Sequence, residues 1–129
     1  MMFQPNLYQQ YKTQSLETLT KGEIVVKLFE EASKQISTAI FLIKRDETPV
    51  NAYNAIAKAQ KIISTLNYSL DMRFGLSVEL RDMYLFIHQK LGEANADRDV
   101  TLMKDMLALV DELKVTFKEA ERLARMQQK

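Results

Sequence analysis

The sequence contains no cysteine, and it has only three glycines and two prolines among 129 residues. The lack of cysteine excludes a disulfide framework and thiolate chemistry, and it favours a reducing compartment such as the cytoplasm. Because glycine and proline are scarce while 47% of the residues are hydrophobic, long helices are favoured over strand-rich folds. A chain of this length can also bury one core without cross-links. We therefore expect a single all-α domain.

Strong charge imbalance and long apolar runs are also absent. The 18 basic and 17 acidic residues leave a formal net charge of +1, so no long-range field attracts phosphates or anionic lipids. No stretch approaches the roughly 18 uninterrupted apolar residues of a membrane-spanning helix. Residues 1–6 lack the basic and apolar regions of a secretory signal. These features predict a cytoplasmic protein that neither binds nucleic acid nor inserts into a membrane.

Histidine chemistry is limited to His88, the single histidine of the sequence. A di-iron site in a helical bundle requires two Glu-x-x-His pairs, whereas Leu85 stands three residues before His88. A catalytic triad would need a nucleophile near this histidine, and none is evident in the sequence. The three glycines are isolated, so there is no phosphate-binding loop. We expect no cofactor, no metal site and no enzymatic activity.

Residues 1–19 are rich in polar side chains and carry scattered leucines and tyrosines without a helical period, so they are interpreted as an N-terminal arm. Behind this arm, apolar residues recur at the spacing of amphipathic helices in four segments. The first segment begins at Thr20, which forms a capping box with Glu23, and the second begins at Pro49. The expected inward residues are Ile24, Leu28, Phe29, Ala32, Ile36, Ala39, Ile40 and Ile43; Ala52, Ile56, Ala59, Ile63, Leu66 and Leu70; Leu80, Tyr84, Ile87, Leu91 and Ala94; and Leu102, Met103, Met106, Leu109, Val110, Leu113, Phe117, Ala120 and Leu123.

The connections between these segments are short. We expect the second helix to end near Gly75, because glycine readily adopts the left-handed conformation after a helix, and Ser77 to cap the third helix. Residues 95–99 are expected to form the turn before the fourth helix. Helices of roughly 20 to 28 residues would be about 30 to 40 Å long. The sequence therefore predicts an antiparallel up-down-up-down four-helix bundle spanning residues 20–129.

Two helices carry more packing surface than one core stripe requires. The second helix has a further face of small and amide-bearing side chains, which permits close approach of a neighbouring helix or of a partner. The third helix has surplus apolar residues, which either contact two neighbouring helices or form a partner groove. The two sets are Tyr53, Ala57, Gln60, Ser64 and Asn67 on the second helix, and Met83, Leu85 and Phe86 on the third.

Three segments resemble the signatures of one known family. They are the arm motif Asn-Leu-Tyr-Gln-Gln-Tyr at residues 6–11, the Gly-Glu-Ile triplet at residues 22–24, and the stretch Ala-Gln-Lys-Ile-Ile-Ser-Thr-Leu-Asn-Tyr-Ser-Leu-Asp at residues 59–71. In these segments the sequence resembles the flagellin-specific export chaperones called FliS. It differs from the usual family pattern at Lys21, where proline is common, and at Phe117, where tryptophan is common.

The resemblance implies an antiparallel bundle around which the disordered C-terminal region of flagellin wraps and folds. Covering this region would prevent premature polymerisation and keep flagellin competent for flagellar type III export. The resemblance further implies that the arm lies over part of the binding surface in the free chaperone. The candidate partner-binding residues are Tyr8, Tyr11, Ile56, Gln60, Ile63, Asn67 and Leu70.

Other partners and one other function remain open at the level of sequence. A co-chaperone, an anti-sigma factor and the export gate are further candidate partners, and the free chain is a candidate for weak homodimerisation. The alternative function is a generic four-helix-bundle adaptor, which homodimerises through its surplus apolar face and has no specificity for flagellin.

Overall fold

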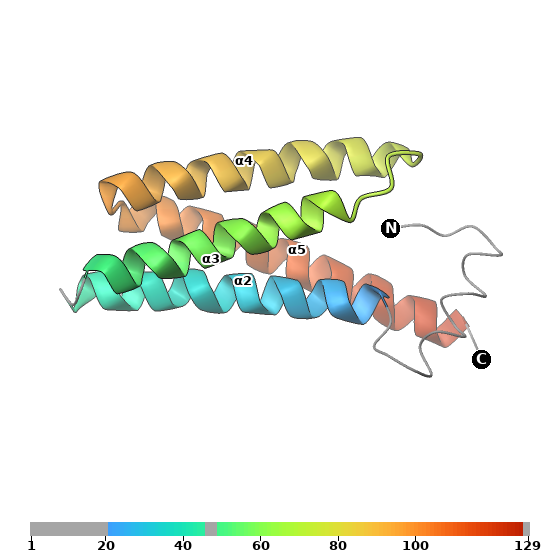
Figure 1. Ribbon diagram of the computed structural model, residues 1–129. Helices are drawn as coiled ribbons and strands as arrows, with labels where there is room; N and C mark the ends of the chain where they lie inside the picture. Colours follow the sequence, from blue (N-terminus) through green and yellow to red (C-terminus); the bar gives the residue numbers. More distant parts are fainter. Residues whose placement is uncertain (1–20, 46–48, 128–129) are drawn as a thin grey trace.

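The computed structural model describes residues 21–45 and 49–127. These residues form four helices: α2 (Lys21–Lys44), α3 (Pro49–Tyr68), α4 (Gly75–Asp97) and α5 (Val100–Gln127). Successive helices run in opposite directions, and α5 returns to lie beside α2 (Figure 1). The predicted up-down-up-down four-helix bundle is confirmed. The arm of residues 1–19 and the predicted cap Thr20 lie outside the described residues.

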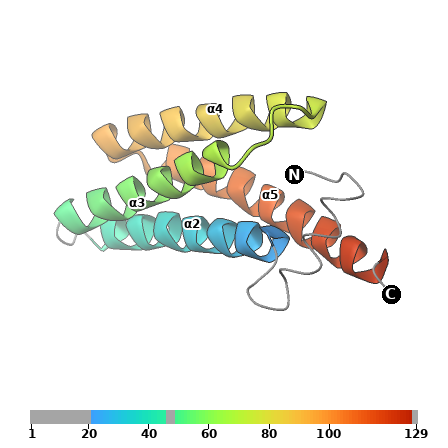
Figure 2. The ribbon, with the colours of Figure 1, turned by 45° about the vertical axis from the view of Figure 1, so that its right-hand side comes forward.

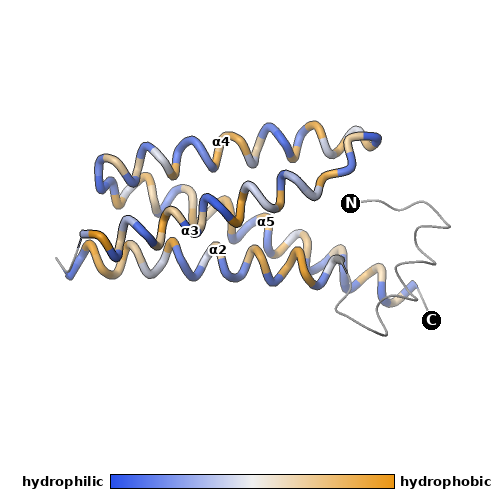
Figure 3. The backbone as a smooth tube through the Cα atoms, viewed as in Figure 1, coloured by the Kyte–Doolittle hydropathy of each residue, from blue (hydrophilic) through white to orange (hydrophobic). Residues whose placement is uncertain are grey.

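The core is built from one apolar stripe on each helix. Hydrophobic and hydrophilic residues alternate along every helix at short intervals (Figure 3), as amphipathic helices require. Met103 and Met106 are buried, as predicted for core-filling methionines. The largest fully buried apolar side chains are Phe29, Ile36, Ile56, Ile63, Leu66, Tyr84, Ile87, Leu91, Met103 and Val110.

The connection between α3 and α4 differs from the prediction. The helix α3 ends at Tyr68, and Gly75 is the first residue of α4 rather than the end of α3. Phe74 occupies the N-cap position, while Ser77 lies buried one turn into the helix and donates a hydrogen bond of 2.7 Å to the carbonyl of Asp71. This bond ties the connection to the first turn of α4, so Ser77 stabilises the segment without capping the helix.

The turn between α4 and α5 is shorter than the predicted residues 95–99. The helix α4 continues to Asp97, and Arg98 reverses the chain in the left-handed conformation with φ of 51°. Asp99 then caps α5, because its Oδ1 accepts a hydrogen bond of 3.0 Å from the backbone N–H of Leu102. Two residues therefore suffice to join the two helices.

The face of small and amide-bearing residues on α3 packs against α4. The amide of Gln60 donates a hydrogen bond of 3.1 Å to the carbonyl of His88, and the amide of Asn95 donates one of 3.1 Å to the carbonyl of Tyr53. Gly92 permits this approach, since a Cβ at this position would lie 3.1 Å from Nε2 of Gln60. This face therefore serves packing between the two helices.

The opposite side of α4 is less closely packed. Toward the C-terminal end of α5, the helices α4 and α5 diverge (Figures 1 and 2), and α5 makes its more extensive contact with α2. We call this end of the bundle, with the first turns of α2 and α4 and the last turns of α5, the wide end. There the predictions for Ile24, Ala120 and Leu123 are wrong: all three side chains are exposed, while Glu121 and Ala124 are buried.

Candidate partner-binding cleft

A cleft of about 320 Å³ opens at the wide end between α4, α5 and the first turn of α2. It exists because α5 follows α2 in its last turns and leaves the apolar side of α4 uncovered. Its lining is almost wholly apolar. The lining residues are Gly22 from α2; Leu76, Glu79, Leu80 and Met83 from α4; and Leu113, Thr116, Phe117, Ala120 and Glu121 from α5.

Aromatic rings pack on the core side of the cleft. The ring of Phe117, which lines the cleft, lies 5.2 Å from the ring of Phe29 between centroids, and Phe29 lies 6.2 Å from Tyr84. Phe29 and Tyr84 are buried, and burial raises the pKa of the Tyr84 phenol above its ordinary value. Each aromatic pair contributes about 0.5 to 1.5 kcal/mol beyond the burial of its area. The cleft is thus preformed on a rigid base.

The α4 wall presents large apolar side chains to solvent. Leu76 is 61% exposed and Met83 is 38% exposed, and Phe86, one turn further along, is 46% exposed. Methionine is flexible and polarisable, so it adapts to irregular apolar surfaces. These exposures favour the partner-groove alternative for the surplus apolar residues of α4. Leu85 is also exposed, but it points to the other side of the helix, because Tyr84 between it and Met83 faces the core.

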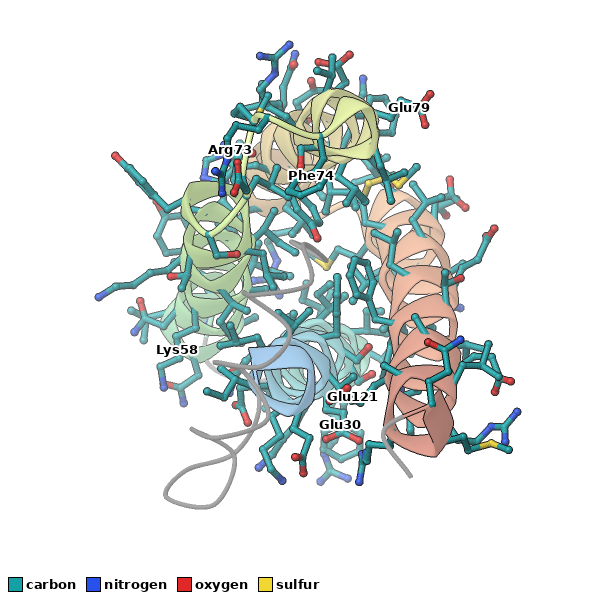
Figure 4. All side chains as sticks on the ribbon, turned by 90° about the vertical axis from the view of Figure 1, so that its right-hand side faces the viewer. Glu30, Lys58, Arg73, Phe74, Glu79 and Glu121 are labelled. Carbon is teal, nitrogen blue, oxygen red and sulfur yellow. The ribbon has the colours of Figure 1, made fainter. Side chains whose placement is uncertain are left out.

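Two carboxylates lie at the cleft in different surroundings. Viewed from the wide end, Glu79 projects from α4 at the outside of the bundle, whereas Glu121 lies between α5 and α2 (Figure 4). Glu79 is exposed, and Glu121 is only 6% exposed. A Cβ added to Gly22 would lie 2.6 Å from the carboxylate atoms of Glu121. The carboxylate of Glu121 is therefore packed directly on the first turn of α2.

Residues 4–124 match the model of the family described as flagellar protein FliS. The chain belongs to the FliS family. A curated relative, the flagellar secretion chaperone FliS of Bacillus subtilis (strain 168), is 30% identical over 115 residues, which cover 89% of this chain and 86% of that protein. The resemblance drawn from the three sequence signatures is confirmed. FliS membership supports a role as a flagellar export chaperone.

The five candidate partner-binding residues of the predicted second helix do not line the cleft of this FliS-family chain. Ile56 and Ile63 are buried in the core. The side-chain amide of Gln60 donates its hydrogen bond to the carbonyl of His88 on α4. Leu70 is half-buried against the core, and Oδ1 of Asn67 is buried without a hydrogen-bond partner among the described residues. Contact of Ile56 and Ile63 with a partner would require the core to open. The roles of all five residues in binding stay predictions.

The two tyrosines of the arm, Tyr8 and Tyr11, lie outside the described residues of the FliS-family chain. Conversely, the sequence interpretation did not include Leu76 or Glu121 among the site residues, although both line the cleft. Leu76 carried a usable signal, because it stands seven residues before Met83 and so shares its helical face. The burial of Glu121 carried no such signal, since a glutamate in a charged helix is normally exposed.

The described part of the FliS-family chain lacks the features of a metal site and of a membrane span. It contains no group of three or more His, Asp or Glu side chains arranged to hold a metal ion. None of its four helices combines the length and the apolar composition needed to cross a membrane. His88 is half-buried on α4.

Proposed function

We propose that this chain is a cytoplasmic export chaperone that binds the disordered C-terminal region of flagellin through the cleft between α4 and α5. The observation that carries the proposal is the preformed apolar cleft of 320 Å³ in a chain of the FliS family. Its apolar lining between two helices suits an amphipathic segment, which buries apolar side chains in the cleft and keeps its polar face in water.

The cleft acts as an anchor within a larger interface. Its volume lies near the lower end of the roughly 300 to 1,000 Å³ that is usual for small-molecule pockets, whereas a stable protein interface buries about 1,200 to 2,000 Å². The exposed side chains of Phe86 and Leu123, which lie outside the cleft lining, supply further apolar surface on α4 and α5. A client segment of several turns can therefore bury apolar side chains both inside the cleft and beyond it.

The mechanism is masking by coupled folding. The client segment is disordered when free, and its ordering on the chaperone opposes the free energy gained by apolar burial. Binding is therefore specific without being irreversible, as export requires. While bound, the apolar face of the segment is unavailable for association with other flagellin subunits, which prevents premature polymerisation and leaves the remainder of the client for the export apparatus.

The arm is proposed to cover part of the cleft until flagellin binds. Its point of attachment supports this role, because α2 begins at Lys21 and the next residue, Gly22, lines the cleft. Tyr8 and Tyr11 bring large rings with a polar hydroxyl, a combination suited to covering an apolar surface that is partly in water. Deletion of residues 1–19 is expected to increase self-association by exposing this surface.

A binding experiment with matched substitutions on α4 tests the proposal. Calorimetry with a C-terminal flagellin peptide is expected to show one-to-one binding and a negative heat-capacity change, with helicity gained by the peptide. Met83→Asp places a charge in the cleft and should weaken binding at least about tenfold, or 1.4 kcal/mol. Leu85→Asp, on the other side of the same helix, is the control and should bind like the parent.

Two results would contradict the proposal. One is the absence of heat together with unchanged elution of both components. The other is an equal loss of affinity in Met83→Asp and Leu85→Asp, which would separate binding from the cleft. Self-association of the parent without any flagellin binding would instead favour the homodimerising adaptor.

A further inference from the structure

The last turns of α5 have two faces, only one of which is packed. Glu121 and Ala124 are buried toward α2. Ala120 lines the cleft on the side of α4, and Leu123 shares the face of the cleft residue Thr116, seven residues earlier. The two faces differ by a rotation of about 100°, the turn of one residue. The unpacked face is the more apolar one, so apolar burial alone favours packing it against α4.

Polar contacts hold α5 on α2 instead. The hydroxyl of Ser33 on α2 donates a hydrogen bond to the carboxylate of Asp111 on α5. The Nζ of Lys118 on α5 lies 3.8 Å from Oε2 of Glu30 on α2. Further along α5, the carboxylate of Glu121 lies against Gly22 of α2, and Glu121 is the most buried residue among the last turns of the helix. It lies where α5 has already diverged from α4 (Figures 2 and 4).

The first turn of α2 is a favourable place for a buried carboxylate. Backbone N–H groups in the first turn of a helix lack partners within the helix, and the helix dipole attracts negative charge there. The carboxylate of Glu121 lies against Gly22 within this turn. A charged group with little exposure is costly unless its surroundings stabilise it, so Glu121 has a strong preference for this position over one against the apolar wall of α4.

Gly22 provides the space for this contact. A Cβ at residue 22 would lie 2.6 Å from Cδ, Oε1 and Oε2 of Glu121. Any side chain at this position would therefore force the carboxylate of Glu121 to shift from its present place against α2. Gly22 and Glu121 therefore fit each other: because Gly22 has no side chain, the carboxylate of Glu121 can lie against the backbone of α2.

We propose that Glu121 is a positioning residue that holds the last turns of α5 on α2 and so keeps the cleft open. This inference rests on the proposed function, because it assigns the regulation of the same cleft. Without the contact, α5 turns its other face to α4, and Ala120 and Leu123 pack on Leu76 and Met83. Packed helices lie about 8 to 10 Å apart, which leaves no space for a client segment between them.

Distances measured across the wide end test the inference without flagellin. The chain has no cysteine, so spin labels attached to Val78→Cys on α4 and Gln127→Cys on α5 are specific, and both positions are exposed. In the full chain, Glu121→Ala is expected to shift the distance distribution by several ångströms to shorter values. Glu119→Ala is the matched control, because Glu119 is an exposed carboxylate on the same turn that pairs with Arg122 within α5; it should keep the parental distribution.

The glycine gives a second, independent variant. Gly22→Ala should also shorten the distance, because the added methyl displaces the carboxylate. In the Glu121→Ala background the same change should have no further effect, since the clashing group is gone, and this non-additivity identifies a direct contact. If Glu121→Ala does not fold, Gly22→Ala carries the test alone.

Binding of the flagellin peptide supplies the functional result. If the open form falls to about one tenth of the population, the apparent Kd rises about tenfold. Parental distances in Glu121→Ala, or in Gly22→Ala where the first variant does not fold, would overturn the inference whatever the peptide does. Shortened distances in chains that bind no flagellin, the parent included, would uphold the contact and count against the proposed function.

Discussion

The two sides of α4 are packed in contrasting ways. Toward α3, amide side chains at Gln60 and Asn95 reach across to backbone carbonyls and hold the helices together. Toward α5, apolar side chains such as Leu76 and Met83 line a cleft. Each of these hydrogen bonds contributes about 0.5 to 1.5 kcal/mol to the stability of the folded state and also fixes the register of the two helices. We call the first contact the closed seam of α4 and the second its open seam; the open seam is the proposed binding surface.

The largest expected effect is on stability, and it comes from the aromatic side chains that pack behind the open seam. Phe29→Ala removes a fully buried ring that contacts both Phe117 and Tyr84. We expect a loss of about 3 to 5 kcal/mol in the free energy of unfolding, as for large-to-small changes in other cores. Chemical denaturation measures this loss. Phe41→Ala is the matched control: Phe41 is 56% exposed on the same helix and contacts the guanidinium of Arg45, so its change should stay within about 1 kcal/mol.

Removing the amides should weaken the closed seam by a smaller amount. Gln60→Ala and Asn95→Ala are each expected to cost about 0.5 to 1.5 kcal/mol, since each removes one hydrogen bond to a carbonyl of the neighbouring helix. The two bonds share no residue, so the costs should add in the double variant. Gln89→Ala, an exposed position on α4, serves as the control in the same denaturation series. Unchanged stability in both single variants would show that apolar packing alone closes this seam.

The smallest expected effect concerns the connection that leads from α3 into α4. Hydrogen bonds from the side chain and backbone N–H of Arg73 hold the pKa of Asp71 at about 2, below its ordinary value of 3.8. A lowered pKa in the folded state stabilises the protein above the unfolded pKa, and this contribution disappears as the pH falls through the folded pKa. Asp71→Asn should therefore lower the melting temperature above about pH 5, and the difference should shrink between about pH 4 and 2.

The control for this pH series is Asp82→Asn, which changes an exposed carboxylate on α4. Its melting curve should follow that of the parent at every pH. A difference between Asp71→Asn and the parent that stays constant down to pH 2 would show that the charge of Asp71 does not stabilise the connection.

The core and the helix order follow from the sequence because apolar spacing is a local signal. Ile56, Ile63 and Tyr84 stand on clear helical stripes and are buried as predicted. The end of α3 was misplaced because Leu70 continues its stripe and remains half-buried beyond the helix. Periodicity shows that a residue faces inward, but it does not distinguish a last helical turn from a connection packed on the core.

The cleft was less predictable because it depends on which neighbour a helix follows. The spacing of Phe117, Ala120 and Leu123 and that of Phe117, Glu121 and Ala124 are both helical, and apolar character favours the first set. The structure buries the second set, since the carboxylate of Glu121 lies against the first turn of α2. Such a contact joins residues at opposite ends of the chain, so local patterns do not reveal it.

The short turn at Arg98 and Asp99 allows the angle between α4 and α5 to change, with each helix acting as a lever. Only these two residues link the helices at one end of the bundle, while the cleft lies at the opposite, wide end. The 23 residues of α4 give a lever about 34 Å long, so a change of about 10° in the angle between the helices moves the far end by roughly 6 Å. Such a motion alters few contacts near the turn. The width of the cleft can therefore vary strongly while the bundle around Arg98 stays intact.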